Sequence, residues 1–177
     1  MLTVEKLHDK SPDLGRTLVL YLAAFPEAER RPWEGMLHDP AGDIGICGLY
    51  REGVYSGFVI LMTQGDICHL MYFAVEEQFR DHGLGGETLL LLRRQLPGLR
   101  LIVDIERQDD SAENAGLRRR RKQFYLRHGY RETGVFYDWQ GVGYEILCDG
   151  GPLTEGEFWG FWKQARARRE AALAKKK

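Results

Sequence analysis

The spacing of apolar residues predicts a helix and then three strands in the first half of the chain. Apolar side chains recur every three or four positions over 14–25, which is typical of an amphipathic helix, and a proline follows. Three apolar runs come next, over 44–50, 54–62 and 67–75, and only short turns containing glycine separate them. These runs predict an antiparallel meander, and a short strand over 2–7 is expected before the helix.

Helices and strands alternate in the second half. Leucines on one helical face predict a helix over 87–96, which a Pro-Gly pair ends. Period-two alternation predicts a strand over 99–106, and a helix is expected from about 114 or 117 to 128. A hairpin follows, with strands over 135–137 and 144–147. This order of elements predicts a mixed α/β (α+β) fold.

The last predicted helix begins at a capping box, because Thr154 and Glu157 stand three positions apart ahead of two aromatic residues. Beyond Ala165 the chain is basic, and we expect it to fray. No repeat or linker-like stretch interrupts the rest of the sequence. The 177 residues are therefore expected to hold a single domain over 1–164 and a basic tail over 165–177.

Composition and charge exclude several classes of protein. The 25 basic and 26 acidic residues give a net charge of -1, so no global field attracts nucleic acid or a membrane. The uncharged stretch 53–65 is too short and too polar to span a bilayer, and no secretory signal is recognisable. Three cysteines without a CxxC pair, and histidines without ligand spacing, indicate neither disulfides nor a metal site. We expect a cytoplasmic protein with no nucleic-acid or membrane partner and no metal.

The most informative segment, 67–96, is a strand followed by a glycine-rich loop and a helix. The loop is Arg80-Asp-His-Gly-Leu-Gly-Gly86, and its glycines permit a tight turn that directs several N–H groups at one point. The helix N-terminus adds a partial positive charge, so the loop suits an anion such as a pyrophosphate. It lacks the Gly-Lys-Ser/Thr of a Walker A loop, and Thr88 replaces the third glycine of the dinucleotide pattern. An ordinary turn is the alternative.

Two motifs in this order resemble the GCN5-related N-acetyltransferase (GNAT) superfamily. Residues 73–85, Phe-Ala-Val-x4-Arg-x-x-Gly-x-Gly, are similar to its acetyl-CoA signature. Residues 123–130, Gln-Phe-Tyr-Leu-Arg-His-Gly-Tyr, are similar to the helix end that follows its fifth strand. The resemblance covers about 2–147. It implies a mixed, mostly antiparallel central sheet, flanked by helices and splayed between strands 4 and 5, with acetyl-CoA in the split.

The resemblance implies direct transfer of an acetyl group from acetyl-CoA, as co-substrate, to an amine of a small molecule or peptide. The implied cofactor-binding residues are Phe73, Ala74, Val75, Arg80, Asp81, His82, Gly83, Leu84, Gly85, Gly86, Asn114 and Tyr125. Asn114 departs from the family pattern, because it precedes Tyr125 by eleven residues, about one helical turn more than usual.

Four residues are candidates for the acid and base chemistry. Tyr125 matches the family's usual acid, which protonates the leaving thiolate, and ordinary packing is the alternative role. His69 occupies the place of the family's strand-4 glutamate; histidine as a residue type suits a general base, and an ordinary structural role is the alternative. Asp104 and Glu106, on one face of the fifth strand, form a competing pair that could instead attract a cationic amine. A water chain leading to a base is a further alternative.

Several questions stay open at this stage. The same fold could serve as a non-catalytic acyl-CoA sensor or interaction module, and the basic runs 118–122 and 165–177 could contact nucleic acid, although the net charge disfavours this. The resemblance places the segments Phe25-Pro-Glu27 and Arg31-Pro-Trp33 where the family's first helices line the acceptor site, and for Trp33 ordinary core packing is the alternative. The sequence identifies neither the acceptor nor the oligomeric state, for which a homodimer is one option.

Overall fold

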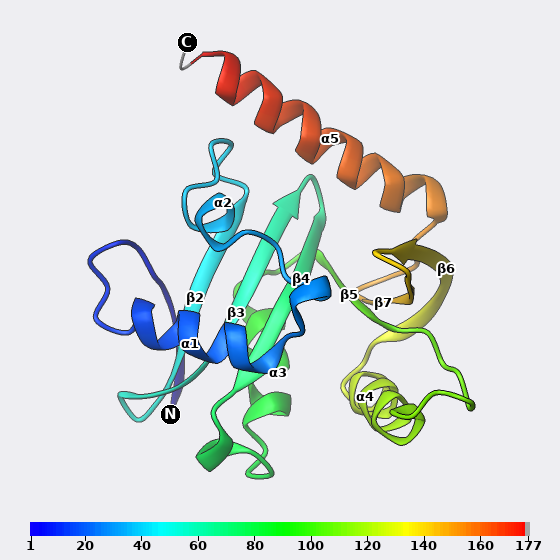
Figure 1. The fold of residues 1–177 in the computed structure, drawn as a ribbon, viewed down its shortest axis with the longest axis horizontal. Helices are drawn as coiled ribbons and strands as arrows, with labels where there is room; N and C mark the ends of the chain where they lie inside the picture. Colours follow the sequence, from blue (N-terminus) through cyan, green and yellow to red (C-terminus); the bar gives the residue numbers. More distant parts are fainter. Residues whose placement is uncertain (176–177) are drawn as a thin grey trace.

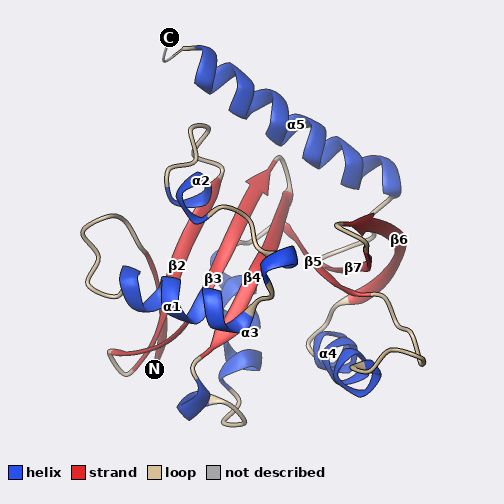
Figure 2. Cartoon of the chain, viewed as in Figure 1, coloured by secondary structure: helices blue, strands red, loops and turns tan. Residues whose placement is uncertain are grey.

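A computed structural model describes residues 1–175 of the chain. In this part, seven strands form one sheet in the order β1-β2-β3-β4-β5-β7-β6 (Figures 1 and 2). The strands are β1 (Leu2–Lys6), β2 (Ile44–Arg51), β3 (Val54–Gln64), β4 (Ile67–Val75), β5 (Arg100–Glu106), β6 (Arg131–Trp139) and β7 (Val142–Asp149). Neighbouring strands are antiparallel except β4 and β5, which are parallel. The predicted mixed, mostly antiparallel sheet is confirmed.

Helices cover both faces of the sheet. They are α1 (Leu14–Ala24), α2 (Trp33–Leu37), α3 (Leu84–Gln95), α4 (Ala115–Arg127) and α5 (Glu155–Ala174), with 3-10 turns η1 (Glu27–Glu29) and η2 (Glu77–Phe79). On one face, α3 and α4 pack through a cluster that includes Leu89 and Tyr125. On the other face, α1 and α2 pack through Tyr21 and Met36, and α5 packs through Phe158. None of the helices within 1–175 combines the length and the hydropathy of a bilayer span.

The two parallel strands pair only where they begin. The ladder between β4 and β5 holds three residue pairs and ends at His69 and Ile102. Directly after this point, the register of β3 against β4 shifts, so that Met71 is an extra residue in β4. A bulge bends a strand and increases its twist, and it therefore explains why β4 diverges from β5 here. The predicted splay between the fourth and fifth strands is confirmed.

Several elements differ from their predicted bounds, and two of these differences concern the site. Helix α3 begins at Leu84, three residues before the predicted start, because Gly83 takes a left-handed conformation (φ 74°) and ends the loop there. The two following glycines therefore lie in the first helical turn. Strand β6 is longer than the predicted 135–137. It pairs with β7 without interruption as far as Trp139, and beyond a register shift between Glu132 and Phe136 it pairs again back to Arg131.

The predicted fraying beyond Ala165 is wrong for the part of the tail that the structure describes, since α5 continues through it. Arg168 forms a salt bridge with Asp43 at 2.9 Å, and Arg169 forms one with Asp39 at 3.4 Å. Both carboxylates belong to the loop between α2 and β2, 125 and 130 residues earlier in the chain. The last two residues of the tail lie outside the described residues.

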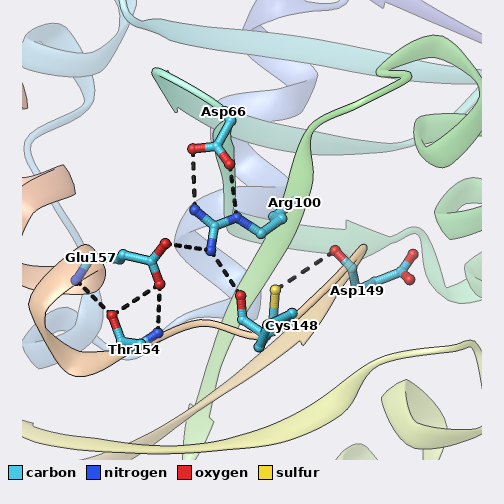
Figure 3. Close-up of polar contacts among 7 residues, drawn as sticks. Asp66, Arg100, Cys148, Asp149, Thr154 and Glu157 are labelled. Carbon is cyan, nitrogen blue, oxygen red and sulfur yellow. Dashed lines mark hydrogen bonds and ion pairs between the residues drawn. The ribbon is translucent and has the colours of Figure 1, made fainter.

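The first turn of α5 is attached to the beginning of β5 (Figure 3). The predicted capping box is present, with Thr154 and Glu157 bonded to each other through side chain and backbone. Arg100, the first residue of β5, donates to both carboxylate oxygens of Asp66 (2.9 and 3.1 Å) and forms a salt bridge with Glu157 at 2.9 Å. Arg100 thus joins the β3–β4 turn, β5 and α5 at the closed end of the splay.

Candidate active site

A cavity of about 1010 Å³ lies where β4 and β5 part. Its walls come from β4, β5, α4, β6, β7 and α5, and from the segment that follows α1. Beyond His69, β4 has no strand partner on the side of β5. Alternate backbone N–H and C=O groups over 70–75 therefore face the opening and are available to a ligand.

The glycine-rich loop ends in the N-terminus of α3, beside the far end of β4. The first hydrogen bond of this helix runs from the Glu87 N–H to the Gly83 carbonyl (3.1 Å). The N–H groups of Leu84, Gly85 and Gly86 thus have no partner within the helix. Three donors and the positive end of a helix dipole are therefore presented together.

The rest of the loop is held compact by its own polar groups. Arg80 lines the cavity, and its Nε donates to the Val75 carbonyl (3.1 Å) at the end of β4. The ring of His82 donates from Nδ1 to the Arg80 carbonyl (2.5 Å), and Asp81 between them has a positive φ of 61°. Arg80 consequently places a positive charge at the end of the cavity that leads to α3.

Two glycines of α3 allow a close approach to α4. A Cβ on Gly85 would lie 3.1 Å from the Phe124 ring. A Cβ on Gly86 would lie 2.3 Å from Nε2 of His128, a separation that no carbon and nitrogen atoms tolerate without movement. The glycines therefore leave the N–H groups uncovered and also let the two helices flanking the splay approach each other.

Tyr125 extends from α4 into the cavity. Its ring is 7% exposed and packs edge-on against Phe124 and Tyr130, with ring centroids 5.1 and 5.2 Å apart. Burial raises the pKa of Tyr125, the Arg121 charge opposes this rise, and the Asp104 charge adds to it. Tyr125 therefore keeps its proton at neutral pH.

Side chains from β4, β5 and β6 form a hydrogen-bonded chain in the cavity. Nε2 of His69 lies 2.7 Å from one oxygen of Asp104, and the Tyr137 hydroxyl donates to the other oxygen at 2.7 Å. Burial alone would raise the pKa of Asp104, but the His69 charge and the two hydrogen bonds outweigh it and lower that pKa. Asp104 is thus ionised at neutral pH and accepts both bonds, so Nε2 of His69 is the donor. The other nitrogen, Nδ1, is buried without a partner among residues 1–175.

Glu106, two residues along β5, has a different environment from Asp104. Its carboxylate accepts from the Asn114 amide (3.1 and 3.3 Å) and forms salt bridges with Arg118 and Arg121, each at 3.2 Å. The carbonyl oxygen of Asn114 in turn accepts from Nε of Arg118 (2.7 Å). Two guanidinium groups therefore neutralise Glu106, and both ends of the Asn114 amide are already used.

The end of the cavity nearest α5 holds an arginine among aromatic rings. The Arg31 guanidinium carbon lies 4.8 Å from the centre of the Trp162 ring and 5.4 Å from that of Trp139. The backbone N–H of Arg31 donates to the hydroxyls of Tyr21 (2.9 Å) and Tyr72 (3.0 Å), and the Tyr21 hydroxyl donates back to the Arg31 carbonyl (2.9 Å). These bonds fix the segment that carries Arg31 above the sheet.

The structure brings most of the predicted residues to one place. His69, Asp104, Glu106, Tyr125 and Arg80 line the cavity together with residues 73–75, and the loop 81–86 adjoins it. Asn114 lies at the start of α4 with its side chain turned to β5.

The cavity residues that were not identified as site residues from the sequence include Tyr137, Trp139 and Trp162. Arg31, which also lines the cavity, lies in the segment that the resemblance places near the acceptor. The alternation of Tyr137 and Trp139 on one strand was a usable signal, but the predicted strand ended at 137. Of the two roles considered for Trp33, the structure shows core packing, because its ring packs on Tyr21 with ring centres 5.5 Å apart.

Comparisons with known proteins identify the fold. No protein-family model and no curated protein matches the sequence. Among solved structures, a protein described as a GNAT-family acetyltransferase from Bacteroides thetaiotaomicron has a TM-score of 0.76 and 20% identity, over 92% of this chain and 94% of that one. A GNAT family acetyltransferase from Elizabethkingia anophelis, with acetyl-CoA bound, has a TM-score of 0.55 and 14% identity, over 84% and 97%. The aminoglycoside 6'-N-acetyltransferase from Enterococcus faecium has a TM-score of 0.60 and 15% identity, over 83% and 96%.

Proposed function

We propose that this chain, which has the fold of the GNAT acetyltransferases, is an acetyl-CoA-dependent N-acetyltransferase. It would transfer the acetyl group directly to an amine of a small molecule or peptide. The observation that carries the proposal is that one cavity, at the splay between β4 and β5, holds unpaired strand-edge groups, a protonated tyrosine and a histidine–carboxylate pair.

The groups at the α3 end of the cavity suit the cofactor. Acetyl-CoA, when bound, supplies an acetyl group activated as a thioester. The N–H groups of 84–86 and the α3 dipole suit its pyrophosphate, and Arg80 adds a positive charge. The unpaired edge of β4 over 73–75 offers N–H groups for the thioester oxygen, where negative charge develops during transfer. Loss of one such donor typically costs ~3 kcal/mol in barrier height.

Tyr125 is the proposed acid. A phenol that keeps its proton at neutral pH can donate it to a thiolate, whose affinity for a proton rises as the acetyl group leaves the sulfur. Its position on α4, at the wall of the cavity, is fixed by packing against Phe124 and Tyr130. The rigid ring therefore holds the hydroxyl in one place.

His69 is the proposed base, oriented by Asp104. Because Nε2 donates to the ionised carboxylate, Nδ1 is left to accept a proton, and Asp104 stabilises the cation that results. The negative charge of Asp104 also favours an approaching ammonium group. Tyr137 holds the second oxygen of Asp104 and so acts as a positioning residue.

Glu106 and Asn114 receive a structural role in this proposal. The Glu106 carboxylate is bound by two guanidinium groups and an amide, so its oxygens are already occupied by partners within the protein. Asn114 joins Glu106 to Arg118 at the β5–α4 connection. We therefore assign these residues to ordering the cavity wall and positioning Arg121.

Isothermal titration calorimetry with acetyl-CoA tests the cofactor site. Gly83→Asp places a negative charge at the α3 N-terminus, and the matched Gly83→Asn has the same size and a similar tolerance of the left-handed backbone. A Cβ at Gly83 meets nothing closer than the Glu87 carboxylate at 4.0 Å, so both side chains fit. We expect the Asp variant to bind acetyl-CoA at least about 10-fold more weakly than the Asn variant. Equal binding by the two variants contradicts the site.

A thiol-release assay with a panel of amines tests the reaction itself. Release of free CoA that depends on both acetyl-CoA and an amine supports the transferase. Tight binding of acetyl-CoA without release, across the whole panel, indicates the non-catalytic sensor instead.

A further inference from the structure

Arg31 is a partly buried cation that lacks a carboxylate partner. Within residues 1–175 its guanidinium forms no salt bridge, and its contacts are with the rings of Trp139 and Trp162. Stacking on aromatic rings engages the flat faces of a guanidinium and leaves its five N–H donors free at the edge. Polar groups that are removed from water normally find partners. Because Arg31 lines the cavity, its donors are available to a ligand there.

Arg31 and the proposed base contact the same indole ring. Trp162 receives the guanidinium on its face at 4.8 Å, and the ring of His69 meets it edge-on with centres 5.6 Å apart. His69 is in turn hydrogen-bonded to Asp104. Arg31 and the His69–Asp104 pair thus meet at one tryptophan, in the part of the cavity away from the glycine-rich loop.

The other acidic groups of the cavity do not neutralise Arg31. Asp104 is bound to His69 and Tyr137, while the carboxylates of the α2–β2 loop pair with arginines of α5. Glu106 pairs with two arginines of α4. Glu29 is close in sequence, yet it forms no salt bridge with Arg31. The free donors therefore suit an anionic group that arrives with the ligand.

We infer that Arg31, held between Trp139 and Trp162, binds a carboxylate of the acceptor, so that the acceptor is an amino acid or a related amine bearing a carboxylate. The inference rests on the proposed transferase function, because it assigns the acceptor of that same site. The amine of such a molecule would face Asp104 and His69, and its carboxylate would accept a bidentate pair of bonds from Arg31.

A purely structural role for Arg31 makes different predictions. It would attach the segment after α1 to β6 and α5 through the two indoles, and its loss would lower stability. The relative preference for one acceptor over another would then stay the same. The experiment must therefore measure a ratio between acceptors and not activity alone.

The experiment uses sets of three matched acceptors: an amino acid, its carboxamide and its decarboxylated amine. For each, kcat/KM is measured by thiol release with the full chain and saturating acetyl-CoA. In the wild type we expect kcat/KM for the amino acid of a preferred set to exceed kcat/KM for its carboxamide at least about 10-fold, which is the effect of one charge-assisted hydrogen bond. Arg31→Met should bring this ratio close to one, and Arg31→Lys should keep part of it. Arg94→Met, an exposed site on α3, is the matched control and should leave the ratio unchanged.

Thermal shift with CoA present provides a second readout, in which amino acids should raise the melting temperature of the wild type but not of Arg31→Met. A carboxamide or plain amine that is used as well as its amino acid overturns the inference, as does an unchanged ratio in Arg31→Met. The inference is also overturned if no carboxylate-bearing amine gives either turnover or a thermal shift. Failure of acetyl-CoA to bind in calorimetry is separate and overturns the proposed function.

Discussion

The hydrogen bond between Tyr137 and Asp104 should stabilise the fold by an amount that depends on pH. Tyr137→Phe removes only the hydroxyl that donates to the Asp104 carboxylate at 2.7 Å. The ring keeps its packing against Tyr144 and Phe158, with centres 5.3 and 5.4 Å apart. The variant therefore isolates one hydrogen bond to a charged group inside the cavity.

The magnitude follows from the type of bond. A hydrogen bond to a charged group contributes roughly 1.5–3 kcal/mol. The Asp104 side chain is 20% exposed, so water can replace part of the lost bond. We expect Tyr137→Phe to lower the free energy of unfolding at neutral pH by about 1–2 kcal/mol. For a chain of this size, this is a decrease in Tm of about 2–8 °C.

The pH dependence has a definite sign. The pKa of Asp104 is lowered in the folded protein, so ionised Asp104 stabilises the fold at neutral pH. That stabilisation is lost as the pH falls through the folded-state pKa. The Phe variant lacks one of the bonds that lower this pKa, so its folded-state pKa lies nearer the ordinary value. The difference in the free energy of unfolding between the wild type and the variant should thus be largest at neutral pH and become smaller below about pH 4.

Urea unfolding of both proteins between about pH 3 and pH 7 measures the effect. Tyr144→Phe is the matched control, because Tyr144 stacks on Tyr137, and burial and neighbouring charges, rather than a hydrogen bond within residues 1–175, raise the pKa of its hydroxyl. Its effect should be small and independent of pH. If Tyr137→Phe lowers the free energy of unfolding equally at all pH values, or does not lower it at neutral pH, the assigned role of this bond is refuted.

Three further predictions concern other parts of the chain. Tyr125→Phe should lower kcat at least about 10-fold, while the affinity for acetyl-CoA, measured by calorimetry, should stay the same. An unchanged kcat excludes Tyr125 as the acid. Lys122→Met leaves the Glu145 carboxylate, which is 4% exposed, without its partner at 2.9 Å. It should lower the free energy of unfolding in urea by about 3 kcal/mol, and adding Glu145→Gln should restore most of that free energy. Arg168→Ala removes the salt bridge between the half-exposed Arg168 side chain and the largely buried Asp43. It should speed amide exchange at the end of α5 and lower the free energy of unfolding by about 1 kcal/mol.

The elements that the sequence predicts well are those whose signals are local. The meander over 44–75 follows from period-two patterns and glycine turns that are complete within the segment. The capping box at Thr154 lies within four residues, and it too is present. The glycine-rich loop was identified for the same reason, since all its donors come from consecutive residues.

The features that the sequence does not predict depend on partners far apart in the chain. The end of α5 is ordered by salt bridges to carboxylates more than 120 residues earlier, and no helical pattern indicates them. Asp104 and Glu106 have different partners: the Tyr137 hydroxyl donates to Asp104, whereas arginines of α4 form salt bridges with Glu106. Alternation places both carboxylates on one face of a strand, but it does not say which of them meets a cation.

The two ends of the cavity also rest on different parts of the core. The helices next to the glycine-rich loop, α3 and α4, pack on one face of the sheet. Arg31, Trp139 and Trp162 belong to elements that meet on the opposite face or at the β6 edge. Side chains in contact couple energetically, whereas distant sites without shared partners act nearly independently. Under the proposed function, a change of acceptor therefore requires substitutions in the segment after α1, in β6 and in α5, and it can occur while the loop 80–86 and its proposed affinity for acetyl-CoA stay as they are.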